Sequence, residues 1–245
     1  MAVMKTPGVY IVEKNAFPNS VVEVATAVPA FIGYTEKAVN GNKSLLNQPW
    51  RIASMAEFRT YFGNAPLPKF AIEEGKAADN SLLFNGKYYT VKRQDAFTLY
   101  YNMLIFYANG GGLCYIVSVG DYSADGIDKE KLEAGIQPLI KEQEPTMVVI
   151  PEAVNLKNAA ECYALQQAVL NHCGNVMKNR FAVLDIYGGE KDRKHPDGDV
   201  VNAFREAIGS NFLDYGAAYY PWINTSTVQE NELSFLNLDV KKLKM

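Results

Sequence analysis

The sequence predicts an α/β fold: a mixed sheet with helices on both faces, plus an extended N-terminal strand-bearing arm and a surface hairpin insertion. Two observations support the sheet and its helices. From residue 97 onward, short continuous apolar runs alternate with longer amphipathic segments. Continuous apolar runs are typical of strands buried on both faces, and their alternation with helices is typical of α/β domains. Residues 1–20 and 64–96 fit neither pattern, so we assign them to the arm and the insertion.

The opening segment, residues 1–20, is predicted to be an extended arm. A Thr-Pro-Gly turn at 6–8 precedes a short strand-like run, and Pro18 then interrupts any regular element. The strand could pair within the chain's own sheet or with an open sheet edge of a neighbouring subunit, since unpaired backbone groups bind either one. The residues predicted to form it are Val9, Tyr10, Ile11, Val12 and Glu13.

The first part of the core spans residues 21–63. Its predicted elements are a strand–turn–strand unit over 21–34, a turn at 40–41, a short extended run at 50–52 and a helix over 55–62. Pro29 is expected at the start of a buried strand, where its missing N–H does least harm. Ser54 and Glu57 have the Ser-x-x-Glu form of a capping box, and Gly63 is expected to end the helix.

Residues 64–96 are richer in polar residues and contain two short apolar runs that flank Asn85-Gly86. Asn-Gly between two such runs is a strong signal for a hairpin, because a type I′ turn needs positive φ at both central residues. We therefore predict a surface hairpin inserted into the core.

The second half of the chain is predicted to alternate helices and strands. The helices are expected over 97–108, 129–143, 158–178 and 200–212, and the strands over 113–119, 146–151, 180–186 and 216–222. Helical spacing turns Ile140 and Val176 toward the core, and continuous apolarity makes 180–186 a third buried strand. The first of these helices should carry one apolar stripe, formed by Phe97, Tyr100, Tyr101, Leu104, Ile105 and Ala108.

No catalytic, cofactor-binding or metal site is predicted. The three cysteines, Cys114, Cys162 and Cys173, are an odd number in apolar runs, which favours buried reduced thiols. His172 and His195 have no metal-ligand spacing, and His195 lies in a charged segment that we expect to be a solvated surface.

Two glycine clusters are tested as phosphate loops, which need the order strand, glycine turn, helix. Gly110-Gly111-Gly112 follows a helix and precedes a strand, so the order is reversed. Gly188-Gly189 follows a strand, but the next helix is expected only near Asp199, and no GxGxxG or Gly-Lys-Ser/Thr is present. Both clusters are therefore interpreted as turns.

Asp185 is the strongest enzymatic alternative, because α/β enzymes place catalytic groups at the carboxyl ends of buried strands. We expect it instead to pair with a nearby arginine or to cap a turn. The aromatic residues Tyr215, Tyr219, Tyr220 and Trp222 could form a ligand platform, but packing on a helix or on a neighbouring subunit is the commoner use of such a cluster.

The composition excludes several function classes. Of the 245 residues, 48% are hydrophobic and 21% are charged, as in a globular chain with a substantial core. A formal net charge of −3 gives no reason to expect nucleic-acid or anionic-membrane binding. No apolar run reaches the roughly 18 residues of a membrane span, and the first ten residues lack the apolar region of a signal peptide. We therefore expect cytoplasmic synthesis and no direct membrane insertion.

Six short segments, in order over roughly residues 6–222, resemble the contractile tail sheath family of phages and related injection systems. The first carries a Thr-Pro-Gly-Val-Tyr opening, and the fourth carries an Asn-Gly-Gly helix-to-strand junction similar to that of the family. None is specific alone, whereas the ordered set is. The segments are 6–13, 26–36, 54–63, 106–117, 180–185 and 217–222.

The resemblance implies a structural subunit that stacks as hexameric rings around an inner tube and contracts to drive the tube through a target envelope. It implies that the arm strand is donated to a neighbouring copy. The implied partners are other copies of the chain, the inner tail tube protein, and baseplate and tail terminator proteins, with no nucleic acid and no cofactor. The implied location is a phage tail or phage-like particle assembled in the bacterial cytoplasm.

We divide the chain into the arm (1–20), the core (21–223) and a tail (224–245) whose apolar residues suggest packing on another chain or a chain that stops early. The family has a further C-terminal domain, whereas only 23 residues follow Trp222 here. That domain is truncated, supplied by a partner, or missing from a short variant. Two alternatives remain for the function: another tail or baseplate structural protein that reuses the sheath core, and an α/β enzyme with a site near Asp185.

Overall fold

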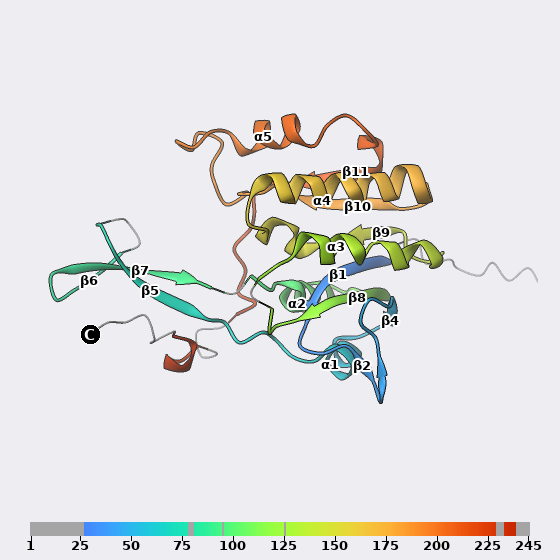
Figure 1. The fold of residues 1–245 in the computed structure, drawn as a ribbon, viewed down its shortest axis with the longest axis horizontal. Helices are drawn as coiled ribbons and strands as arrows, with labels where there is room; N and C mark the ends of the chain where they lie inside the picture. The colour runs from blue at the N-terminus through green and yellow to red at the C-terminus, as the bar shows by residue number, and fades with distance from the viewer. Residues whose placement is uncertain (1–26, 78–80, 95, 125, 229–232, 239–245) are drawn as a thin grey trace, which may run out of the picture.

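The fold is built around one mixed six-stranded sheet, and the predicted α/β class is confirmed (Figure 1). The computed structural model describes residues 27–77, 81–94, 96–124, 126–228 and 233–238. The strand order is β11-β10-β9-β1-β8-β4, and every neighbouring pair is parallel except β4 with β8. The strands are β1 (Pro29–Thr35), β4 (Trp50–Ile52), β8 (Cys114–Asp121), β9 (Met147–Val149), β10 (Phe181–Asp185) and β11 (Gly216–Tyr219).

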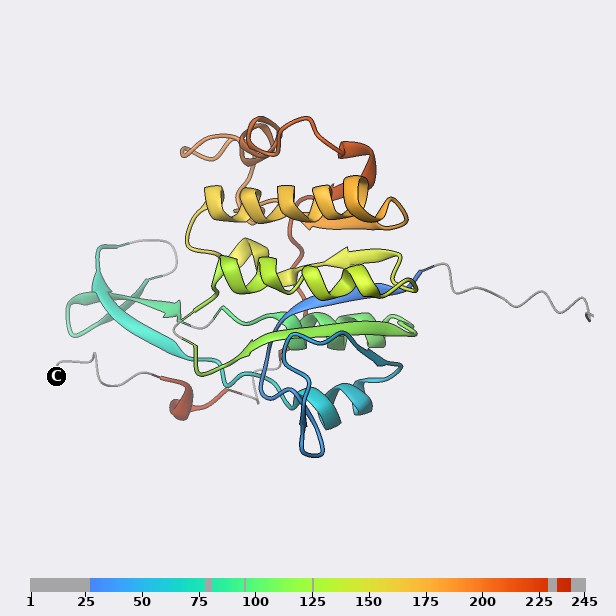
Figure 2. The same cartoon turned by 45° about the vertical axis from the view of Figure 1, so that its right-hand side comes forward.

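Helices cover both faces of this sheet, as predicted. The helices α3 (Lys129–Ala134) and α4 (Ala159–Asn171) pack on one face, and α1 (Met55–Phe62) and α2 (Leu99–Ala108) pack on the other (Figure 2). Alternate side chains of β1 serve the two cores: Ile32 points toward α3 and α4, and Phe31 points toward α1 and α2. Every residue of β1 is buried, and Pro29 is its first residue.

A buried carboxylate joins three elements beneath the start of α2. Glu152 lies in the 3-10 helix η2 (Pro151–Asn155) and is fully buried. Its Oε2 accepts from the backbone N–H of Tyr34 (2.8 Å), and its Oε1 accepts from Thr98 (3.0 Å) and Leu99 (3.2 Å). The bonds to Thr98 and Leu99 satisfy N–H groups that a helix start leaves unpaired.

The start of α1 follows the predicted capping signal with one change. Ser54 is the N-cap, and its Oγ accepts from the Glu57 N–H (3.2 Å). The Glu57 carboxylate reaches back to the N–H of Ala53 (2.7 Å), one residue before the N-cap that a capping box would use. Gly63 ends the helix at φ 86°.

The insertion forms its own three-stranded antiparallel sheet, in the order β5-β7-β6. Its strands are β5 (Phe70–Gly75), β6 (Leu82–Phe84) and β7 (Lys87–Arg93). The predicted hairpin is confirmed: Asn85 and Gly86 have φ of 49° and 75° and join β6 to β7. A second small hairpin, β2 (Val39–Asn40) with β3 (Lys43–Ser44), surrounds the predicted Asn40-Gly41 turn.

Two predicted helices differ from the structure. The helix expected over 129–143 is broken: α3 is followed by the 3-10 helix η1 (Gln137–Lys141), because Pro138 cannot donate a helical hydrogen bond. This break leaves Ile140 exposed rather than buried. The helix expected over 158–178 ends as a π-helix (His172–Met177), whose wider turn changes the helical phase and exposes Val176.

The other two helices are shorter than predicted. Helix α2 begins at Leu99, so Phe97 lies before it, and its buried residues are Leu99, Tyr100 and Met103. Of the predicted stripe, Phe97 and Tyr100 are buried. Helix α5 (Val200–Ala207) ends before Gly209, which has φ of 74°, and Phe212 lies outside it. In each of these four helices, a local feature overrides the apolar periodicity. The feature is a proline, a π-helical turn, a glycine or tertiary packing.

Residues 233–238 of the tail pack on the insertion of the same chain. The 3-10 helix η6 (Phe235–Asn237) is anchored by Asn237, whose Nδ2 donates to the Pro68 carbonyl (2.9 Å). Leu238 forms an isolated parallel bridge with Phe70 at the start of β5. Phe235 and Leu236 remain exposed.

Candidate interaction surface

The residues proposed for strand donation, Val9 to Glu13, lie outside the described residues, as does the whole arm over 1–20. Their role therefore stays a prediction. The other sequence-derived candidates fall within the described part of the chain, and their surroundings are given below.

The cysteines and histidines form no chemical site among the described residues. Cys114, Cys162 and Cys173 are buried free thiols, as expected, and burial raises their pKa values, to about 11 for Cys114 and to about 12 for the other two. His172 is buried beside Arg180, and desolvation followed by the charge of Arg180 lowers its pKa to about 4. No group of His, Cys, Asp and Glu that could hold a metal ion occurs within the described ranges.

Arg180 serves the fold rather than a carboxylate. Its buried guanidinium donates to the backbone carbonyls of Leu139 (2.9 Å) and Glu142 and contacts Nε2 of His172 (3.2 Å). It thereby ties the end of η1 to the residue that precedes β10. The neutral His172 ring can accept from Arg180, consistent with its lowered pKa.

Both glycine clusters are turns, as interpreted. Gly110 has φ of 83° and follows the end of α2. Gly189 donates to the Ile186 carbonyl (3.1 Å) in a turn after β10, and any Cβ on it would lie 2.5 Å from the Trp222 ring. Gly189 therefore permits the close packing of Trp222, whose Nε1 also donates to the Ile186 carbonyl (3.1 Å).

Asp185 does not pair with an arginine, contrary to our expectation. Its side chain has no hydrogen-bond or ion-pair partner among the residues that the structure describes, and only its backbone carbonyl accepts a bond, from Gln166 Nε2 (2.7 Å). Asp185 is exposed, and nearby protein atoms desolvate its carboxylate only in part. This desolvation raises its pKa.

One half of the sheet is covered on a single face. The open face, as we call it, is formed by Phe181, Val183 and Asp185 of β10 with Tyr219 of β11. Phe181 is 38% exposed and Tyr219 is 59% exposed, so β10 is not the doubly buried strand that the sequence predicted. Alternate residues Ala182 and Leu184 are buried against the α4 side.

The open face follows from the topology. From β8 onward the chain adds β9, β10 and β11 in one direction along the sheet. Right-handed crossovers in one direction place every connecting helix on the same face. Thus α3, α4 and α5 share one side, whereas α1 and α2, which precede β8, cover only the other side of β1 and β8.

A hollow of about 580 Å³ lies beside the open face. Its walls come from α2 (Asn102 and Ile105), from η2 (Val154) and from the segment 219–223, and Asp185 lies among them. Within this segment Ile223 is 81% exposed. The predicted aromatic cluster is thus partly present, since Tyr219, Tyr220 and Trp222 line the hollow and Tyr215 does not.

A second apolar surface lies on the insertion. The hairpin patch is formed by Leu82, Leu83 and Phe84, which are 61%, 63% and 66% exposed. The insertion sheet projects away from the six-stranded sheet (Figures 1 and 2). Contiguous exposed apolar residues on a projecting element are typical of interaction sites.

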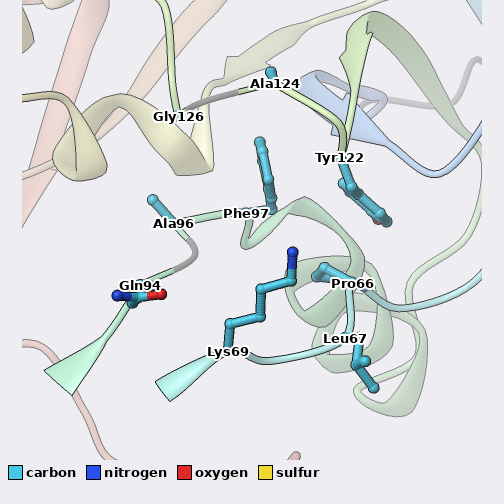
Figure 3. Close-up of a pocket in the computed structure, with 9 residues that line it drawn as sticks. All are labelled: Pro66, Leu67, Lys69, Gln94, Ala96, Phe97, Tyr122, Ala124 and Gly126. Atoms are coloured by element: carbon cyan, nitrogen blue, oxygen red, sulfur yellow. The ribbon is translucent and has the colours of Figure 1, made fainter. Parts of the chain in front are cut away.

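A cavity of about 570 Å³ lies at the root of the insertion, between Pro66 and Leu67 on one side and Phe97 and Tyr122 on the other (Figure 3). Lys69 extends toward it from the start of the insertion (Figure 3). Lys69 and Tyr122 are the only titratable side chains among its described lining residues, and burial raises the pKa of Tyr122.

None of the described helices is both long enough and apolar enough to cross a membrane.

Comparison with known proteins connects the chain to two solved assemblies. A chain in the cryo-EM structure of the anti-feeding prophage (AFP) baseplate in the contracted state matches with a TM-score of 0.57 and 23% identity, over 94% of this chain and 50% of that one. A chain in the cryo-EM structure of the AFP helical sheath in the contracted state matches with a TM-score of 0.47 and 22% identity, over 89% and 46%. The chain thus spans about half the length of the solved chains it matches. No protein-family model and no curated protein matches it.

Proposed function

We propose that this chain is a structural subunit of the contractile sheath of a phage-tail-like injection system and that it has no catalytic site. The observation that carries the proposal is the fold similarity to the AFP baseplate chain, with a TM-score of 0.57 over 94% of the chain. The exposed apolar surfaces support it, because a subunit that assembles must keep such surfaces free until it meets its partners.

In this proposal, copies of the chain stack as hexameric rings around an inner tube protein, between a baseplate and a tail terminator, in a particle assembled in the bacterial cytoplasm. The arm (1–20) donates its strand at residues 9–13 to a neighbouring copy, and the core (21–223) forms the body of each subunit. Extended arms link subunits head to tail, which gives contacts that propagate rather than close.

Electron microscopy of the purified full-length chain tests this function. Rings, tubes or sheets built from many copies are the expected result. A chain that stays monomeric at every concentration examined would contradict the sheath proposal.

Deletion of residues 1–15 separates the arm's role from that of the core. The deletion should abolish polymerisation and leave the melting temperature nearly unchanged, because the arm strand is proposed to pair outside its own subunit. A large loss of melting temperature would instead assign the arm to the chain's own core.

A second candidate is a baseplate or tail structural protein that uses the same fold without forming a sheath. The solved chain with a TM-score of 0.57 belongs to a baseplate structure, which favours this alternative. Such a protein would form one ring or one collar of fixed size, whereas assemblies of a sheath subunit would grow longer as protein concentration increases.

A further inference from the structure

The hollow and the hairpin patch lie on different parts of the chain and have complementary chemistry. The hollow places apolar and aromatic side chains around Asp185. The hairpin patch places Leu82 and Phe84 on the strand face that carries Lys87, and Leu83 on the opposite face. We propose that the hairpin patch of one copy occupies the hollow of a neighbouring copy, with Lys87 of the first facing Asp185 of the second. The inference rests on the proposed function, because it names surfaces through which copies associate.

The hollow requires a partner that carries a positive charge. Asp185 has no partner among the described residues, and no lysine or arginine lines the hollow. A carboxylate in partly desolvated surroundings gains stability when a cation approaches it. Tyr219 and Trp222 add ring faces that attract an ammonium group.

The hairpin supplies both the charge and the apolar surface. Lys87 lies directly opposite Phe84 in the ladder, so its stem follows the patch. Its ammonium now contacts Glu74 (2.9 Å), and both side chains are 56% exposed. Exposed ion pairs of this kind contribute little stability, so Lys87 can exchange Glu74 for another carboxylate.

The insertion is long enough to reach another copy. Strand β7 has seven residues, so at about 3.4 Å each it extends about 24 Å. The two surfaces differ, and each copy carries one of each, so the contact is heterologous. Each added copy leaves one hollow and one hairpin patch free, and the assembly continues.

Cross-linking of two variants that each carry one added cysteine tests this contact. Copies with Leu83→Cys and copies with Ile223→Cys are mixed as full-length chains and treated with a short thiol-reactive cross-linker. The three native cysteines are buried and serve as an internal background. Both substituted positions are exposed, so both variants should melt at the wild-type temperature, and that measurement confirms their folding.

The mixture should give a cross-linked dimer, whereas each variant alone should give none, because the contact joins position 83 to position 223 and neither position to itself. The matched control pairs Val176→Cys, which is also exposed but lies on the π-helix, with Ile223→Cys. We expect the mixture to give about tenfold more dimer than this control pair, which corresponds to about 1.4 kcal/mol. Equal yields would overturn the inference.

Charge exchange examines the proposed pairing independently. Lys87→Glu alone and Asp185→Lys alone should each weaken association about tenfold, because each places like charges together. The double variant should recover most of the loss, since the exchanged charges again attract. Additive losses in the double variant would overturn the pairing.

The outcomes for the inference and for the proposed function are separable. Assembly without the 83–223 cross-link would overturn the hairpin contact and leave the sheath proposal standing. Absence of any association by sedimentation would overturn both.

Discussion

The two halves of the six-stranded sheet have similar apolar strands but different surroundings. In β1 and β8, both faces are covered, and residues such as Ile32 and Ile116 are fully buried. In β10 and β11, one face is covered and Phe181 and Tyr219 are exposed on the other. The difference teaches that the direction of the chain's crossovers, and not the apolarity of a strand, decides whether its second face is covered.

The largest expected effect is a core truncation in the covered half. Ile116→Ala should reduce the free energy of unfolding by about 3–4 kcal/mol, because it leaves a cavity between β8 and α2. Calorimetry should show a melting temperature lower by about 10 °C. A loss below about 1 kcal/mol would mean that this half is no better packed than the open one.

A second prediction concerns two buried titratable groups that oppose each other. Burial raises the pKa of Glu152 from 4.5 to about 7. Its contribution to the free energy of unfolding is therefore present below pH 4.5 and is lost as pH rises to about 7. Burial lowers the pKa of His172 from 6.5 to about 4. Its contribution to the free energy of unfolding is therefore present above pH 6.5 and is lost as pH falls to about 4. Each difference corresponds to about 3 kcal/mol at 1.36 kcal/mol per pKa unit.

The pH dependences of these two contributions to stability have opposite signs and should nearly cancel in the wild-type chain between pH 4.5 and 6.5. Denaturant titrations of Glu152→Gln should then show stability that rises with pH, and those of His172→Gln should show stability that falls with pH. Parallel curves for the two variants would contradict these assignments.

The third prediction addresses the wall of the hollow. Gly189→Ala should reduce stability by about 1–2 kcal/mol, because the new Cβ would lie 2.5 Å from Trp222 and must displace the ring. The fluorescence of Trp222 should shift to longer wavelength as the ring gains contact with water. Gly112→Ala is the matched control, since nothing lies within 4 Å of its added Cβ; equal effects of the two substitutions would contradict the packing argument.

The smallest effect is expected on the open face itself. Phe181→Ala should cost less than about 1 kcal/mol in the isolated subunit, because the side chain is already partly solvated. A larger loss in urea titrations would show that the face is covered in solution and would remove the contrast between the two halves.

The sequence was informative where local chemistry decides the structure. The Asn85-Gly86 turn, the Ser54 cap and the buried run of β1 were predicted from residue types whose backbone preferences are strong. The sequence was misleading where periodicity was extended past a breaker, as at Pro138, or through a π-turn that no residue type announces.

The interaction surface could be predicted only in part. The aromatic residues at 219–222 and the apolar hairpin were visible as patterns, but their exposure depends on which elements fail to cover them. That Asp185 has no partner among the described residues was missed, because this is a property of the tertiary arrangement. The bonds of Glu152 to residues 34, 98 and 99 were missed because no pattern near Glu152 announces partners so distant in the chain.

The borders of the six-stranded sheet are both short: β4 has three residues and β11 has four. Short edge strands offer few unpaired backbone groups to another strand, so they disfavour the edge-to-edge pairing that leads to fibrils. The proposed sheath subunit, which would meet many copies of itself, would benefit from this restraint. Non-specific association through the edge strands is then weak, and ordered assembly depends on contacts between specific side chains.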